Sequence, residues 1–133
     1  MRDARTLLAL LALILAPRAG MAQGDYQLAL ALRNPEPAAE TQFGYAVAAV
    51  GSHVLVGAPF DDGVATDAGA AYLFDGGTGA LLHTFRSPNP AAGDWFGIAV
   101  AAVGENVLVG ALGDDTGARD AGAAYLFDGR TGA

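Results

Sequence analysis

The sequence contains no cysteine and no lysine, and it has only two histidines and one tryptophan. The absence of cysteine excludes disulfide bonds, thiolate nucleophiles, zinc–thiolate sites and a lipid anchor on a cysteine. The protein must therefore be held together by packing. The sequence also lacks a Gly-x-Ser-x-Gly nucleophile motif and a phosphate-binding P-loop motif. We therefore expect no catalytic site within these residues.

Positive charge is scarce as well. The chain has seven basic residues, all arginine, against 14 acidic residues, which gives a net charge of −7 at pH 7. Such a chain repels phosphate backbones and anionic lipid headgroups, so nucleic acids and membrane surfaces are not expected partners. Cations or cationic groups suit this charge better. The alternative is that the acidic surface serves only to keep an exported protein in solution.

Long hydrophobic runs are absent after the N-terminus. The longest apolar run covers residues 7–16, and a helix of that length spans about 15 Å, roughly half of a bilayer core. Arg2 and Arg5 precede the run, and residues 20–22 (Gly-Met-Ala) place small side chains before a cleavage site. This layout predicts a secretory signal peptide over residues 1–22, with a membrane anchor as the alternative. Cleavage would leave a secreted, periplasmic or cell-surface protein with no membrane span and a net charge of −9.

The most informative feature of the remaining chain is an internal repeat. Residues 28–80 align without a gap on residues 81–133, and 35 of the 53 aligned positions are identical. A repeat of this length that is rich in short apolar runs indicates a β-propeller or a solenoid. Because parallel β-helices use much shorter coils, the repeat length favours the propeller.

Each repeat predicts four short antiparallel strands. In the first copy they cover residues 44–50, 54–58, 70–74 and 80–85. Asp75-Gly76 between two apolar runs is a strong hairpin signal, and the second copy reproduces it. The sequence therefore predicts an all-β fold made of two four-stranded antiparallel blades of a β-propeller. We expect Phe43 and Phe96, and likewise Tyr72 and Tyr125, to occupy equivalent buried positions.

The predicted blades define the domain organisation. Residues 23–133 form a partial propeller with a first strand at 25–32, repeat one at 33–85 and repeat two at 86–133. A propeller ring needs about four to eight blades, so two blades do not close one. We expect a fragment of a longer propeller or a ring built from several chains. The apolar faces left bare would then contact further blades of the parent chain or a second copy.

The motifs resemble a known family. Phe43-Gly44 followed by Val-Leu-Val-Gly-Ala-Pro at residues 54–59 is similar to the FG-GAP repeat of the integrin α-chain N-terminal β-propeller. The second copy keeps Phe96-Gly97 and Val109-Gly110-Ala111 but has Leu112 in place of the proline. The resemblance covers residue 33 to the end. It implies a seven-bladed extracellular propeller that acts in adhesion or ligand binding.

Two features of related propellers are not carried over. Many FG-GAP repeats bind calcium through carboxylates between their first two strands, but the corresponding turns at residues 50–53 and 103–106 lack the aspartates of that motif. A second resemblance is to quinoprotein propellers, whose repeat reads Asp-x-x-Thr-Gly before a docking tryptophan, as in residues 75–79. Here His83 stands where that tryptophan would be.

Three aspartates in each copy are the only metal-ligand candidates. They lie on the loop between the second and third predicted strands and recur in register: Asp61, Asp62 and Asp67, and then Asp114, Asp115 and Asp120. Three carboxylates on one loop bind a hard cation such as calcium weakly if backbone carbonyls complete the shell. The alternative is that these aspartates accept hydrogen bonds from their own backbone and shape the turn.

The expected function follows from these features. We expect an exported, non-catalytic propeller module that binds an extracellular protein or a glycan, needs no cofactor and binds calcium weakly at most. His53 and His83 do not recur between the copies, and no motif joins them to a nucleophile. The alternative is part of a quinoprotein-like or hydrolytic propeller enzyme whose active site lies outside this segment.

Overall fold

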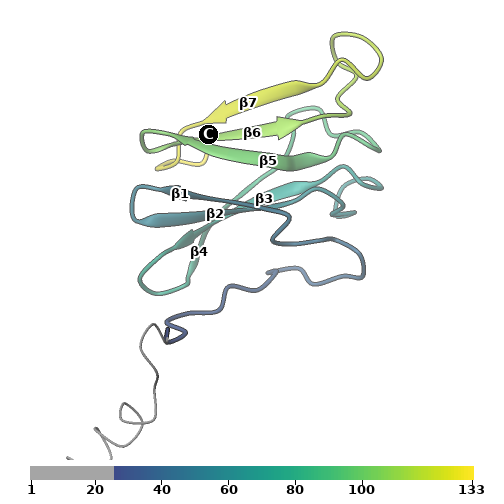
Figure 1. Ribbon diagram of the computed structural model, residues 1–133. Helices are drawn as coiled ribbons and strands as arrows, with labels where there is room; N and C mark the ends of the chain where they lie inside the picture. The colour runs from purple at the N-terminus through teal and green to yellow at the C-terminus, as the bar shows by residue number, and fades with distance from the viewer. Residues whose placement is uncertain (1–25) are drawn as a thin grey trace, which may run out of the picture.

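A computed structural model describes residues 26–133, which form seven β-strands in two sheets (Figure 1). The first sheet has the strand order β1-β2-β3-β4 and the second has the order β5-β6-β7. All neighbouring strands are antiparallel. The strands are β1 (Ala46–Val50), β2 (His53–Ala58), β3 (Ala70–Asp75), β4 (Leu81–Phe85), β5 (Phe96–Val103), β6 (Asn106–Ala111) and β7 (Ala123–Phe127). Each repeat thus forms its own antiparallel sheet, which confirms the predicted all-β fold. The prediction of four strands is right for the first sheet, whereas the second sheet has three strands among the described residues.

The predicted signal peptide at residues 1–22 lies outside the described residues. Within residues 26–133 the structure contains no helix long and apolar enough to cross a membrane.

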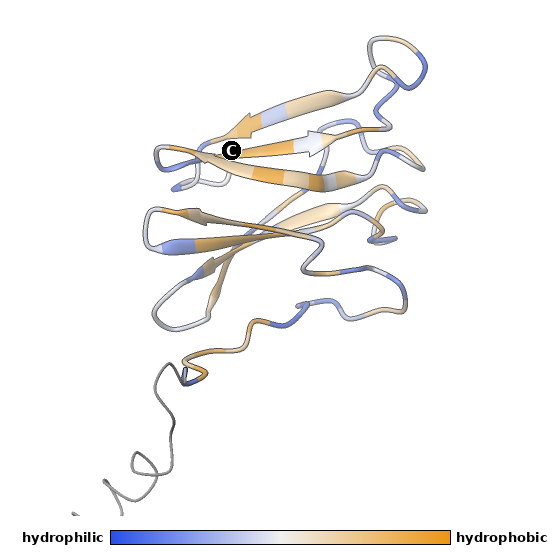
Figure 2. Cartoon of the chain, in the orientation of Figure 1, coloured by the Kyte–Doolittle hydropathy of each residue, from blue (hydrophilic) through white to orange (hydrophobic). Residues whose placement is uncertain are grey.

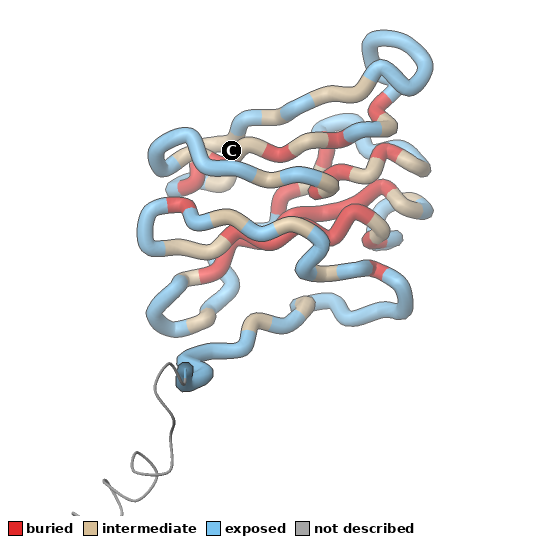
Figure 3. The backbone as a smooth tube through the Cα atoms, in the orientation of Figure 1, coloured by how far each residue is buried: buried red, intermediate tan, exposed pale blue. Residues whose placement is uncertain are grey.

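β2 and β3 lie in the middle of the first sheet and are buried on both faces. Leu55 and Leu73 belong to one hydrophobic cluster, whereas Val56 and Tyr72 belong to a second cluster on the opposite face. A strand covered on both faces needs a continuous apolar run, because neither set of alternating side chains meets water. Figure 3 shows these central strands as the longest buried stretch of the backbone.

The connections divide the molecule into two ends. Short turns join β1 to β2, β3 to β4 and β5 to β6 at one end, which we call the turn end. Longer loops join β2 to β3, β4 to β5 and β6 to β7 at the opposite end, which we call the loop end. Hydrophobic residues follow the strands and hydrophilic residues gather in the connections (Figure 2).

The main hydrophobic core lies between the two sheets. Leu55, Leu73 and Phe85 of the first sheet share one buried cluster with Phe96 of the second. The rings of Phe85 and Phe127 lie 5.0 Å apart, centroid to centroid. Full burial of one such side chain contributes about 1.5–3 kcal/mol. This packing holds together a chain that has no disulfide bonds.

Main-chain hydrogen bonds join the sheets at the loop end. Residues 93–96 donate to carbonyl oxygens of the β2–β3 loop at 2.9–3.0 Å, from Gly93 to Thr66, from Trp95 to Asp67 and from Phe96 to Ala68. A parallel bridge also pairs Gly69 with Phe96. The backbones approach so closely that a Cβ atom on Gly57 would lie 2.1 Å from the carbonyl oxygen of Gly97. We call this row of contacts the seam.

The strand predicted at residues 25–32 is not formed over residues 26–32. Leu32 instead packs beside Phe43 on the cluster that contains Tyr72, and the Leu30 side chain lies close to Gly79. The segment therefore lies against a sheet face and a turn rather than along a strand edge. A strand forms only beside a strand edge that exchanges main-chain hydrogen bonds with it. The apolar pattern of these residues was therefore not enough to predict a strand.

The equivalent aromatic residues are buried unequally. Tyr72 and Phe96 are fully buried, as predicted, whereas Phe43 and Tyr125 are only half-buried. Tyr72 is covered by Phe43 and by the segment around Leu32, and Phe96 lies between the sheets. The prediction of equal burial was therefore wrong for the two residues next to an open part of the surface.

Candidate functional site

The loop end contains all six aspartates that the sequence singled out. Three lie between β2 and β3 and three lie between β6 and β7. The two loops share their backbone conformation, because Asp67 and Asp120 both adopt φ of 52°. The structure therefore places the two sets of aspartates equivalently.

Asp61 is buried, and its carboxylate accepts three hydrogen bonds from described residues. Its Oδ2 atom accepts from the Tyr72 hydroxyl at 2.9 Å, and its Oδ1 atom accepts from the Gly63 N–H and from Arg86 Nη1, each at 2.9 Å. Burial by itself raises the pKa of Asp61, but the bonds from Arg86, Gly63 and Tyr72 outweigh it and leave the pKa below its ordinary value. Arg86 also pairs with Glu36 at 3.1 Å. Asp61 is thus a charged anchor for the loop.

Asp114 occupies the equivalent position but has fewer partners. It accepts from the Tyr125 hydroxyl and, at 2.8 Å, from the Thr116 N–H. The Tyr125 bond first, and then the Thr116 bonds, lower the pKa of this carboxyl. Within residues 26–133 no arginine pairs with Asp114. The second network therefore lacks the cation that completes the first.

The next aspartate of each loop closes a backbone ring. The Asp62 carboxylate accepts from the Asp67 N–H at 2.8 Å, and the Asp115 carboxylate accepts in the same way from the Asp120 N–H. Both bonds span five residues and hold the loop in its turn. The aspartates therefore shape the loops, which was the structural alternative for these residues.

The aspartates do not come together as metal ligands. No group of three acidic or histidine side chains in the described part of the chain is placed to hold a metal ion. Calcium prefers six to eight oxygen ligands, whereas protein donors already occupy both Asp61 oxygens. Weak calcium binding by these loops stays a prediction.

Three aromatic side chains form a cluster across the loop end. Tyr45 precedes β1, Phe60 follows β2 and Trp95 precedes β5. The Tyr45 and Phe60 ring centroids lie 6.3 Å apart, and those of Phe60 and Trp95 lie 5.9 Å apart, both edge to face. Tyr45 is 55 % exposed, and the other two rings are partly exposed. We call these residues the aromatic cluster.

The sequence analysis missed the aromatic cluster. Its members are positions at which the two copies differ: Tyr45 corresponds to Ile98, Phe60 to Gly113 and Trp95 to Gln42. The alignment of the two copies could have indicated these residues. A side chain that only supports the sheet is expected to be the same in both copies, so a difference favours another role. Trp95 also adopts φ of 54°, close to the 50° of its counterpart Gln42, so the backbone there belongs to the repeat.

Negative charge surrounds the aromatic cluster. The loop-end segments 33–45, 59–69, 86–95 and 112–122 hold nine carboxylates and three arginines, a net charge of −6. The turn-end segments carry far less charge. The loop end is therefore the acidic end of the molecule, and its field attracts positively charged groups.

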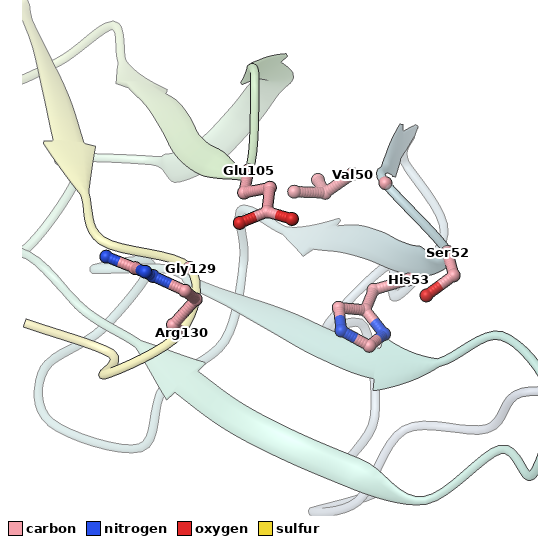
Figure 4. Close-up of a pocket in the computed structure, with 7 residues that line it drawn as sticks. Val50, Ser52, His53, Glu105, Gly129 and Arg130 are labelled. Atoms are coloured by element: carbon pink, nitrogen blue, oxygen red, sulfur yellow. The ribbon is translucent and has the colours of Figure 1, made fainter.

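A small pocket opens between the sheets at the turn end (Figure 4). Its volume is about 140 Å³, and its walls are Val50, Gly51, Ser52, His53, Glu105, Gly129 and Arg130. Ser52 and His53 come from the first sheet and lie across from Glu105 and Arg130. Among the described residues, His53 Nδ1 is buried without a hydrogen-bond partner.

The histidines do not form a catalytic arrangement. His83 Nε2 lies 3.1 Å from the Arg130 carbonyl oxygen. In the described part of the chain neither His83 nor His53 makes a hydrogen bond to a serine or a carboxylate. A general base must reach the group that it deprotonates, and no such pair is present among these residues.

Comparison with known proteins identifies the repeat. A family model described as the FG-GAP repeat matches residues 32–74 and, a second time, residues 84–127, which together exceed half of the chain. The first match includes β1, β2 and β3 except for its last residue, and the second includes β5, β6 and β7. No curated protein matches the chain.

Proposed function

Because the chain belongs to the FG-GAP repeat family, we propose that it is part of an exported, non-catalytic propeller module that binds an extracellular protein or a glycan. The family match concerns the FG-GAP repeat, and this favours a binding module over the quinoprotein resemblance of residues 75–79. The proposed export rests on the signal-peptide pattern of residues 1–22.

The observation that carries this proposal is the aromatic cluster. Tyr45, Phe60 and Trp95 are partly exposed at the loop end and are not required by the repeat. Aromatic side chains offer large, rigid contact areas and are enriched among the residues that dominate binding energy. Repeats keep the scaffold, so side chains that break the repeat at the surface are the natural place for recognition.

The proposal is tested by binding to defined surfaces. The purified, fluorescently labelled protein is applied to an array of immobilised glycans and purified extracellular matrix proteins. Tyr45→Ala removes the most exposed ring of the cluster, and a central aromatic anchor contributes about 2 kcal/mol or more to binding. We therefore expect roughly thirtyfold weaker binding to whichever arrayed molecule the wild type captures.

Tyr26→Ala is the matched control, because Tyr26 is 94 % exposed and is not part of the aromatic cluster. It should leave binding unchanged. Equal binding by the Tyr45→Ala variant would remove the cluster from the site. Turnover of a glycoside, an ester or a redox dye by the purified protein would contradict the non-catalytic assignment.

A further inference from the structure

The interface inside the chain joins two different faces of the repeat. We call the two surfaces of each sheet face A and face B. In the first sheet face A contains Val50, Leu55, Ala71 and Leu73, and in the second sheet face B contains Phe96, Val107, Val109 and Ala111. These two faces pack against each other. Every one of these residues is identical in the other copy. Each sheet therefore carries the complete residue set for both sides of this interface.

Face A of the second sheet is bare. Leu126 is 56 % exposed and Val103 is 50 % exposed, although their counterparts Leu73 and Val50 are buried. A shallow hollow of about 200 Å³ lies on this face, lined by Ala99, Ala101, Leu108, Gly110 and Ala124 among others. Figure 3 shows β7 mostly exposed or intermediate, in contrast to the buried β3. An apolar surface of this kind is typical of an interaction site.

Two glycines are closely packed in one copy and open in the other. A Cβ atom on Gly57 would clash with Gly97, but on Gly110, the counterpart of Gly57, it would meet no atom closer than 3.6 Å. A Cβ atom on Gly44, the counterpart of Gly97, would meet nothing within 4 Å. Among the described residues no close contact therefore requires position 110 to be glycine. A second Gly44 placed against it would reproduce the contact seen between Gly57 and Gly97.

An arginine and a carboxylate also lack, within the described residues, the ion pair that their counterparts form. Arg86 pairs with Asp61 at 2.9 Å. The counterpart of Arg86 is Arg33, which is exposed and makes no ion pair within residues 26–133, and the counterpart of Asp61 is Asp114. Arg33 and Asp114 have no ion-pair partner among the described residues and lie in different repeats, so a second copy can bring them together.

The segment before Arg33 lies on face B of the first sheet at the place that β4 occupies on face B of the second sheet. Leu32 packs on the cluster with Phe74, just as its counterpart Phe85 packs on Phe127, the counterpart of Phe74. In the first sheet Leu73 on β3 pairs with His83 on β4, and β7 has no strand on its outer edge among the described residues. By the same register Leu30 of a second copy would pair with Leu126.

We propose that this chain associates head to tail with a second copy of itself. Face A of the second sheet of one copy receives face B of the first sheet of the next, residues 28–32 of the next copy pair with β7, and Arg33 binds Asp114. Such a heterologous contact builds a ring if the rotation closes and a filament if it does not. Two to four copies would supply the four to eight blades of a propeller.

Gly110→Ala is the first test. The added Cβ fits within its own chain, where the nearest atom is the Ala99 Cβ at 3.6 Å, but it fills the contact made by Gly44 of the second copy. Sedimentation velocity should show concentration-dependent oligomers of the wild type and a folded monomer of the variant, with unchanged far-ultraviolet dichroism. Gly117→Ala is the matched control, since a Cβ atom added to Gly117 would meet no atom within 4 Å and Gly117 lies off the proposed interface. It should assemble as the wild type does.

Arg33→Gln supplies a second variant that leaves the sheets untouched. Loss of a charge-assisted bond should weaken association about tenfold or more. Arg119→Gln is its control, because the Arg119 side chain is 92 % exposed and its ion pair within residues 26–133 is with its neighbour Asp120. A wild type that stays monomeric at all concentrations, or a Gly110→Ala variant that assembles normally, overturns the proposal.

The absence of cysteine allows the register to be tested directly. A Leu30→Cys variant is mixed with a Leu126→Cys variant and oxidised, and the mixed dimer should form in excess over both homodimers. Val64→Cys replaces Leu126→Cys as the control, because Val64 is similarly exposed but lies in a loop. Equal cross-linking of Leu30→Cys to both partners refutes the proposed strand pairing.

Discussion

The two Tyr–Asp pairs permit one substitution to be compared in two settings. Tyr72 donates to Asp61 in a fully buried site, and Tyr125 donates to Asp114 where the ring is half-buried. Tyr→Phe removes only the hydroxyl and keeps the ring. A hydrogen bond to a charged group contributes about 1.5–3 kcal/mol, whereas an ordinary net hydrogen bond contributes about 0.5–1.5 kcal/mol. We expect Tyr72→Phe to lower the free energy of unfolding by about 1.5–3 kcal/mol, because water does not replace the lost donor.

Tyr125→Phe is the matched variant and should cost about 1 kcal/mol or less, because the Tyr125 ring is only half-buried and water can take the place of the lost hydroxyl, although the Asp114 side chain itself is buried. Urea unfolding followed by the fluorescence of Trp95, the single tryptophan, measures both at concentrations where the protein is monomeric. For a domain of this size each kcal/mol also shifts the melting temperature by about 4–8 °C. Equal losses for the two variants, or a larger loss for Tyr125→Phe, would refute the argument from burial.

The same pair predicts a pH dependence. The folded-state pKa of Asp61 lies below its ordinary value. A group whose pKa is lowered by folding stabilises the fold above its unfolded value of about 3.9, and this contribution is lost as the pH falls through the folded value. The difference between wild type and Tyr72→Phe should therefore shrink in acid. A difference that grows as the pH falls would show that Asp61 is not the charged partner.

Three further outcomes are expected. Gly57→Ala should lower the free energy of unfolding by about 1–3 kcal/mol or more, because the new Cβ meets the rigid carbonyl of Gly97, while Gly117→Ala should change little in the same urea titration. Millimolar calcium should stabilise the protein by on the order of 1 kcal/mol at most, and a calorimetric rise of tens of degrees would reveal a strong site. Asn in place of Asp61 or Asp114 should reduce the loss of stability between pH 5 and pH 2, since both carboxyls have a lowered folded-state pKa; unchanged acid profiles would contradict this.

The sequence predicted the sheets because local signals and the repeat agreed. Apolar runs bounded by turn residues located all seven strands of the described residues to within two residues. The N-terminal strand failed for a different reason. Its apolar pattern is right for a strand, but pairing depends on whether a free edge lies beside it, and no local pattern contains that information.

The candidate site was harder to predict than the fold. The aspartates were located correctly, but their hydrogen bonds depend on loop geometry, which decides whether Asp62 meets a cation or the Asp67 N–H. The aromatic cluster was missed because Tyr45, Phe60 and Trp95 lie far apart in sequence and meet only when the sheets pack. Comparison of the two copies at each position would have found these residues as unexplained differences.

The seam gives the molecule a mechanical direction. At the loop end a force that separates the sheets must break several backbone hydrogen bonds together. At the turn end the pocket between Ser52 and Glu105 separates the sheets, and the 3.1 Å contact of His83 Nε2 with the Arg130 carbonyl oxygen crosses between them. The two sheets are therefore joined more firmly at the loop end, which acts as the hinge when the sheets separate. We expect tension that pulls the two sheets apart to separate them first at the turn end. Phe60 of the first sheet and Trp95 of the second would then stay in contact at the loop end. A ligand bound at the loop end would thus stay bound under a pulling force that already separates the sheets at the turn end.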